Sequence, residues 1–158
     1  MNADHYKTFS ALNDAHYDYF ASLPLFIRLP EFNAAVVHAG VFPGVSLEKQ
    51  SAQHLLHIQC INPPATRSYW PSKAPVDHQF WANYYTGPER IIYGHSVLEK
   101  PLMTEWAVGV DTGAVFGGGL TALVLPEWQF VSVKSRNFGT RRNKVALYEA
   151  QNGVRMYS

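Results

Sequence analysis

The chain has 158 residues, of which 47% are hydrophobic and 16% charged, a composition typical of one globular domain and not of a disordered segment. Its formal net charge of +1 argues against general electrostatic binding to nucleic acid or to an anionic membrane. The sequence has a single cysteine and shows neither a signal peptide nor a membrane-spanning apolar run, so we expect a cytoplasmic protein without an internal disulfide.

The first half of the chain predicts helices that alternate with a strand. Residues 13–14, Asn-Asp, are typical of a helix start, and Pro24 closes the apolar pattern that follows them. Residues 32–37 predict a buried strand, because they form a short apolar run before a turn-rich segment. Ser46 is expected to cap a second helix whose apolar positions extend to residue 58.

The second half predicts an irregular segment followed mainly by strands. Residues 61–75 contain four prolines, too many for a regular element, and Asp77 is expected to cap a short aromatic helix. Strands are predicted at residues 90–93, 107–110, 120–125 and 130–134. The turn-like residues between the last two predict an antiparallel hairpin, so the whole order indicates a mixed α/β fold.

Two of the predicted strands end in a histidine close to a glycine. His38 precedes Gly40 by two residues, and His95 directly follows Gly94. Each glycine is expected to permit a sharp turn and to leave room for an ion or ligand. Because ligands bind at the carboxyl ends of strands in open α/β sheets, the two imidazoles are candidates to share one cation. Spacing alone leaves the alternative of two ordinary loop histidines, since no cysteine or carboxylate cluster accompanies them.

Three segments in a fixed order resemble one known family. They are His-Ala-Gly at residues 38–40, Tyr-Gly-His-Ser at 93–96, and a long block containing Asp-Thr-Gly at 109–123. Together they resemble the second half of a calcineurin-like metallophosphoesterase, closest to the bis(5′-nucleosyl)-tetraphosphatase and bacterial-type serine/threonine protein phosphatase branch. The resemblance covers residues 13–135, most of the chain.

The resemblance implies a fold and a division of the chain. Family members are α/β (α+β) proteins with a metallo-dependent phosphatase-like four-layer αββα sandwich. We expect this chain to form its carboxyl-terminal half, with a mixed sheet and terminal antiparallel strands. Residues 1–135 are assigned to that half domain, and residues 136–158 to a basic tail that we expect to be poorly ordered.

The resemblance also implies metal-dependent hydrolysis of phosphoric esters, with a phosphoprotein or a dinucleoside polyphosphate as substrate. Intact members hold two divalent ions, and the family pattern makes His38 and His95 ligands of one of them. Manganese, iron or zinc suits such ligands. Gln59 stands where the family usually has a phosphate-clamping arginine, so a weakened phosphate site is expected there, with Arg67 as a candidate to supply the charge. Asp111 is a candidate substrate contact, although in this family its loop mainly shapes the pocket floor.

Two further histidines have the i, i+3 spacing of a chelating pair. They are His54 and His57, on the second predicted helix. Because no third ligand is placed nearby, we interpret them as part of a solvated helix face.

The motifs of the family's first half do not occur in this sequence. These motifs are Gly-Asp-x-His-Gly, Gly-Asp-x-x-Asp-Arg-Gly and Gly-Asn-His-Glu/Asp, which in the family provide the bridging carboxylate, the other ion's ligands and the catalytic His–Asp pair. No catalytic residue is therefore assigned here, and we expect a chain that is catalytically incomplete by itself. It would be a truncated gene product, one partner of a split gene or a shortened piece. The alternative is a non-catalytic binding module that pairs with an amino-terminal half or self-associates, and a third reading is a degenerate product without a function.

Overall fold

A five-stranded mixed sheet forms the centre of the molecule. The structure is a computed structural model that describes residues 3–136, 147–149 and 155–157. In the order of the sheet, the strands are β1 (Phe26–Leu29), β2 (Ala34–Val37), β6 (Arg90–Tyr93), β9 (Ala107–Gly109) and β8 (Leu102–Met103). β2, β6 and β9 are parallel neighbours, whereas β1 and β8 pair antiparallel at the two edges. The carboxyl ends of β2, β6 and β9 therefore meet at one edge of the sheet.

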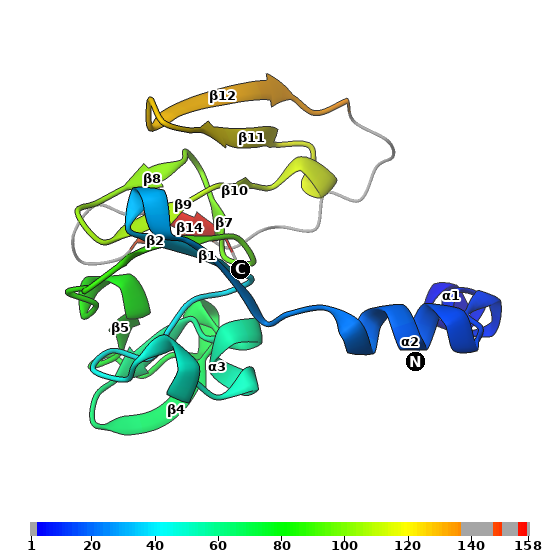
Figure 1. Ribbon diagram of the computed structural model, residues 1–158, viewed down its shortest axis with the longest axis horizontal. Coiled ribbons are helices and arrows are strands. Elements are labelled where there is room, and N and C mark those ends of the chain that lie inside the picture. The colour runs from blue at the N-terminus through cyan, green and yellow to red at the C-terminus, as the bar shows by residue number, and fades with distance from the viewer. Residues whose placement is uncertain (1–2, 137–146, 150–154, 158) are drawn as a thin grey trace.

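Three small antiparallel sheets surround the central one. The first contains β10 (Asp111–Thr112), β11 (Gly119–Val124) and β12 (Gln129–Lys134). The second contains β4 (Ala65–Tyr69), β3 (Cys60–Asn62) and β5 (Gln79–Phe80). The third contains β13 (Leu147–Glu149), β14 (Arg155–Tyr157) and β7 (Val97–Leu98). Figure 1 shows β11 and β12 on one side of the central sheet and β4 and β5 on the other.

The helices are short, and the first two project away from the body of the molecule (Figure 1). They are α1 (Ala3–Ala11), α2 (Asp14–Ser22) and α3 (Ala52–His57), with 3₁₀ turns at η1 (Pro30–Phe32), η2 (Leu47–Lys49), η3 (Pro71–Lys73), η4 (Trp81–Asn83) and η5 (Ala114–Phe116). As predicted, Asn13 caps α2, and its side chain accepts a hydrogen bond from the His16 amide. In the described part of the chain, no helix has the length and apolar character needed to cross a membrane.

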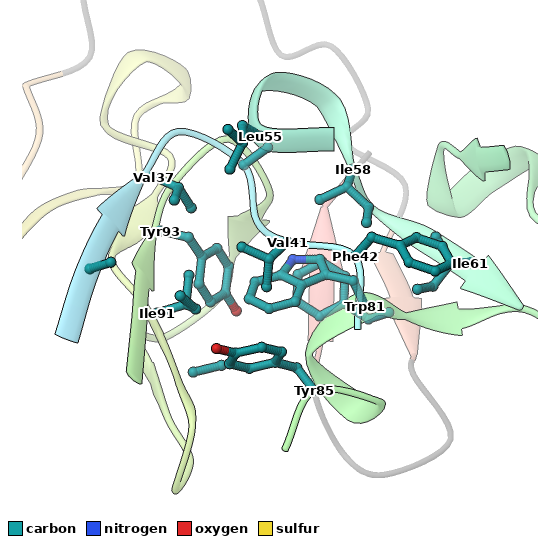
Figure 2. Packing of buried hydrophobic residues seen from close by; sticks show 14 of the residues in the cluster. Val37, Val41, Phe42, Leu55, Ile58, Ile61, Trp81, Tyr85, Ile91 and Tyr93 are labelled. Carbon is teal, nitrogen blue, oxygen red and sulfur yellow. The ribbon is translucent and has the colours of Figure 1, made fainter. Parts of the chain in front are cut away.

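The main core is built around the fully buried indole of Trp81. Its ring lies 5.1 Å from that of Tyr93, centroid to centroid, and Figure 2 shows Val41 and Tyr85 beside it. A Cβ atom added at Gly40 would lie 2.3 Å from this indole. Gly40 is therefore required by close packing against Trp81, so the expectation that this glycine leaves room for an ion or ligand is wrong.

Several predicted elements differ from the observed ones near the start of the chain. Residues 32–37 are not one strand, because Phe32 ends η1 and only residues 34–37 form β2. Asn33, with φ of 47°, makes the left-handed turn between them. Ser46 precedes only η2, whereas Ser51 caps α3 by accepting a hydrogen bond from the His54 amide at 3.1 Å.

The proline-rich segment is more regular than expected. β3 and β4 form a hairpin within residues 60–69, and its turn is the Pro63–Pro64 pair, where a missing backbone donor does no harm. Asp77 does not cap a helix, because its carboxylate instead accepts a hydrogen bond from Asn62 at 2.7 Å and contacts His78. Residues 79–83 form β5 and η4 in place of the expected aromatic helix.

The later strands and the fold class were predicted correctly. β6 has the expected bounds, β9 ends one residue early, and β11 and β12 form the expected antiparallel hairpin. The mixed α/β class with a mixed sheet and antiparallel strands is confirmed. The proposed basic tail, residues 136–158, lies outside the described residues apart from Arg136, β13 and β14; β14 pairs with β7.

Candidate active site

The two histidines of the predicted metal site lie side by side at the edge of the central sheet. β2 and β6 are parallel neighbours with Val36 opposite Ile92, and the Gly94 amide donates a hydrogen bond to the carbonyl of His38 at 2.9 Å. The residues just beyond the two strands are thereby held together. His38 Nε2 lies 3.2 Å from His95 Nδ1, which confirms the expected convergence of the two imidazoles.

The backbone and burial of His95 are unusual for a histidine that is merely structural. Its φ of 63° falls in the left-handed region, which costs about 1–3 kcal/mol in a residue other than glycine. Its Nε2 atom is buried and has no hydrogen-bond partner among the described residues, and neither has the buried Ser96 hydroxyl. Strain and an orphaned buried nitrogen at one position indicate a functional constraint.

The surroundings of His95 favour its neutral form. Burial lowers the pKa of His95, and the nearby His38 and His57 lower it further, while Asp111 opposes them. A neutral imidazole is the form that binds a metal ion. Asp111 also shapes the loop, because its Oδ1 accepts a hydrogen bond from the Gly113 amide at 3.0 Å. Asp111 lines neither of the two hollows described below, so its role as a substrate contact stays a prediction.

The spacing of the two ring nitrogens suits a shared ion. Two nitrogens bound to one ion at about 2.1 Å lie about 3.0–3.4 Å apart, depending on the bond angle. The 3.2 Å separation of His38 Nε2 and His95 Nδ1 falls within that interval. No group of three or more His, Cys, Asp or Glu side chains within the described ranges is arranged to hold a metal ion. The pair therefore fits part of a coordination shell.

A pocket of about 390 Å³ lies beside the histidine pair, between α3 and β4. We call it the α3–β4 pocket; it is lined by Gln53, His54, His57, Gln59, Thr66, Arg67, Ser68, Tyr69 and Trp70. Both sequence-predicted phosphate contacts therefore lie in it. Gln59 is 3% exposed, whereas Arg67 is exposed with its guanidinium 4.8 Å from the centre of the Tyr69 ring. None of the lining residues carries a carboxylate, so the pocket suits an anionic ligand.

Two residues that join this pocket to the histidine pair were not recognised in the sequence. The ring of His57 lies 6.0 Å from that of His95, and the ring of Trp70 lies 5.8 Å from it, between centroids. His57 is exposed on α3 as expected, but its contact with His95 gives it a place at the site. No local pattern marks Trp70, because its position depends on the β3–β4 hairpin. The solvated face expected for His54 is wrong, because this side chain is half-buried, with Nε2 2.9 Å from the Thr66 carbonyl and its ring stacked on Phe42.

A second hollow in the described part of the chain is larger. Its volume is about 500 Å³, and it lies between β7, the Asp-Thr-Gly loop and β12. Its described lining contains no histidine, and its aromatic and aliphatic side chains come from Val97, Leu98, Phe116 and Val133. Of the site residues predicted from the sequence, Gln59 and Arg67 line the smaller α3–β4 pocket, and none lines this hollow.

The fold is shared with a solved structure. The crystal structure of a candidate diadenosine tetraphosphatase matches with a TM-score of 0.70 and 26% sequence identity, over 81% of this chain and 58% of that one. The likeness places the chain among proteins with the metallophosphoesterase fold, as its motifs implied. No model of a protein family matches the chain.

The curated relatives are bis(5′-nucleosyl)-tetraphosphatases of the asymmetrical type. The chain is 35% identical over 119 residues to the protein of Halalkalibacterium halodurans, covering 74% of this chain and 46% of the relative. It is 33% identical over 132 residues to that of Anoxybacillus flavithermus, covering 82% of this chain and 51% of the relative. The resemblance to the calcineurin-like branch is thus confirmed for the carboxyl-terminal part of those proteins. The chain spans about half the length of the curated relatives it matches.

Proposed function

We propose that this chain provides half of the active site of a metal-dependent dinucleoside-polyphosphate hydrolase. The observation that carries the proposal is the 3.2 Å contact between His38 Nε2 and His95 Nδ1 at the ends of adjacent parallel strands. It occurs in a chain whose relatives are named tetraphosphatases. A divalent manganese, iron or zinc ion bound there would polarise a phosphoryl oxygen and lower the pKa of bound water.

The chain's own residues bind and orient a phosphorylated ligand. His38 and His95 present one nitrogen each toward the shared position, and the lowered pKa of His95 keeps its lone pair free at neutral pH. Arg67 places a positive charge at the rim of the α3–β4 pocket. Gln59 offers an uncharged amide in the same pocket, which holds phosphate less strongly than a guanidinium.

We also propose that the chain is catalytically incomplete by itself. Two imidazoles do not fill a coordination shell, and the sequence contains none of the family motifs that supply the remaining ligands. Those ligands would come from an amino-terminal half, so the substrate is hydrolysed only by the combined site. We propose the cytoplasm as its location, because the thiol of Cys60 is free and buried.

A non-catalytic binding module or split-enzyme partner is the alternative, and one observation favours it. The outward face of the β11–β12 hairpin exposes Leu120, Val131 and Val133, each more than half accessible to solvent. Apolar side chains that cluster on one sheet face mark a surface that binds another protein or another copy.

Isothermal titration with Mn²⁺ and with Zn²⁺ tests the metal site in the 158-residue chain. We expect weak binding of one ion per chain, and we expect either His38→Gln or His95→Gln to remove it because one remaining imidazole is insufficient. His16→Gln is the matched control: it removes an imidazole far from the pair while keeping a residue that suits the third position of helix α2. Unchanged metal binding in the His38→Gln, His95→Gln double variant would overturn the assignment.

A further inference from the structure

Trp70 exposes a large aromatic surface beside the histidine pair. It directly follows β4, and 54% of its surface is accessible to solvent. Its ring centroid lies 5.8 Å from that of His95, so one side of the indole contacts the proposed metal ligand. Hydration of an exposed indole is unfavourable, so a planar ligand that covered this surface would gain free energy from burying it.

The pocket next to Trp70 has the chemistry of a nucleotide site. Arg67 and the ring of Tyr69 form a cation–π pair along the same strand, and Thr66 and Ser68 add hydroxyl groups. Gln53 and Gln59 bring amide groups that both donate and accept hydrogen bonds. The pocket thus combines a flat aromatic surface, a positive charge and neutral hydrogen-bonding groups, without a carboxylate. A phosphate ester of a planar heterocycle matches that combination.

The geometry points to a role for Trp70 that rests on the proposed function and specifies its substrate. We propose that Trp70 is the stacking platform for the nucleobase of the nucleoside whose phosphate lies at His38 and His95. When the phosphate lies at His38 and His95, the nucleobase, which is one ribose away, lies over the indole of Trp70. Trp70 is then a specificity-determining residue, which selects nucleoside phosphates over phosphoproteins and simple phosphate esters.

Stacking on Trp70 has a specific consequence for which ligands bind. Base–aromatic stacking is tolerant of base identity, because every base has a π face. Adenosine and guanosine monophosphates should therefore bind about equally, and both should bind more tightly than ribose 5-phosphate, which lacks the base. Loss of the stack weakens binding about 5- to 150-fold.

Isothermal titration of the 158-residue chain with AMP, ribose 5-phosphate and inorganic phosphate, each in saturating Mn²⁺, tests this role. We expect AMP to bind most tightly, Trp70→Leu to reduce its affinity to that of ribose 5-phosphate, and Trp70→Phe to retain most of the difference. AMP should also quench indole fluorescence in the parent chain and do so much less in Trp70→Phe. Phe20→Leu is the matched control, because Phe20 is 52% exposed on the distant helix α2.

The results separate this inference from the proposed function. Equal affinities of AMP and ribose 5-phosphate, or an AMP affinity unchanged by Trp70→Leu, would overturn the role of Trp70 while leaving the phosphate site in place. Failure of all three ligands to bind, with His95→Gln making no difference, would overturn the proposed function as well. Preferential AMP binding that Trp70→Leu abolishes and His95→Gln weakens supports both.

Discussion

Gln59 is the residue at which a single substitution should most change phosphate binding. It lines the α3–β4 pocket but has no charge, and its own backbone amide is held by the Ser68 hydroxyl at 2.8 Å. Gln59→Arg should raise the affinity for inorganic phosphate about tenfold, because a charged donor contributes about 1.5–3 kcal/mol and burying the guanidinium offsets part of that gain. Isothermal titration with phosphate in Mn²⁺ measures the change.

The control for this substitution changes the same residue type in the same pocket. Gln53 also lines the pocket but is exposed on α3. Gln53→Arg adds the same charge, but solvent screens it there, so the gain in phosphate affinity should be much smaller. Equal gains from both variants would show that only net charge matters. No gain from Gln59→Arg in a folded protein would mean that the phosphate lies elsewhere or that Arg67 already supplies the charge.

The β11–β12 hairpin has two chemically different faces. One face carries a chain of hydroxyl contacts, from Thr112 to Thr121 and from Thr121 to Ser132, each of 2.7 Å. On the opposite face, Leu120 pairs with Val133 across the strands, and both are about 60% exposed. Leu123 and Phe130 lie on the same face as the hydroxyl groups and pack on the core, so a slip of one residue would turn them to solvent and break the hydroxyl contacts.

The apolar face of the hairpin predicts self-association of the isolated chain. The double variant Leu120→Lys, Val133→Glu should reduce it, because opposite charges on neighbouring strands preserve the pair while removing the apolar contact. Sedimentation velocity over a range of concentrations measures the effect. Val115→Lys is the control, since Val115 is 93% exposed but belongs to η5 and not to the hairpin. A parent chain that stays monomeric at high concentration contradicts the prediction.

The strands predicted correctly are those in which the local sequence pattern and the packing in the folded chain favour the same secondary structure. The apolar run of β6 is buried between two parallel strands, and the turn between β11 and β12 lies at residues 125–128, one residue before the predicted 126–129. The β3–β4 hairpin was missed because prolines usually end an element, whereas here Pro63 and Pro64 occupy the turn itself. Strand β1 was missed because it is mostly exposed at the sheet edge and has no alternating apolar pattern.

The candidate site was predictable to the extent that its residues follow strands. His38 and His95 follow β2 and β6, so the strand-end rule brings them together. His57 and Trp70 could not be found in this way, because their contacts with His95 depend on how α3 and the β3–β4 hairpin pack. Periodicity assigns residues to faces of elements but does not say which faces meet.

At the scale of the whole molecule, we expect activity only when a complementary half is present. The chain alone, with Mn²⁺, should hydrolyse diadenosine tetraphosphate negligibly, since under the proposed function it supplies only part of a two-metal site. An amino-terminal fragment of a relative that carries the missing motifs should restore hydrolysis. Product formation followed by chromatography measures this, with the His38→Gln, His95→Gln chain as the control. Robust hydrolysis by the purified chain alone, abolished by His95→Gln, contradicts the proposal.

The hydrogen bond from the Gly94 amide to the His38 carbonyl couples two strands that are far apart in sequence. The spacing of His38 and His95, the proposed metal ligands, is thereby set by the roughly 4.8 Å distance between neighbouring strands and not by the chain that connects them. That connecting chain includes α3 and β4, and with them the whole pocket beside the pair. In the proposed site, insertions or exchanges there would alter substrate choice without moving the two histidines. Specificity and metal binding can therefore evolve, or be engineered, as separate modules.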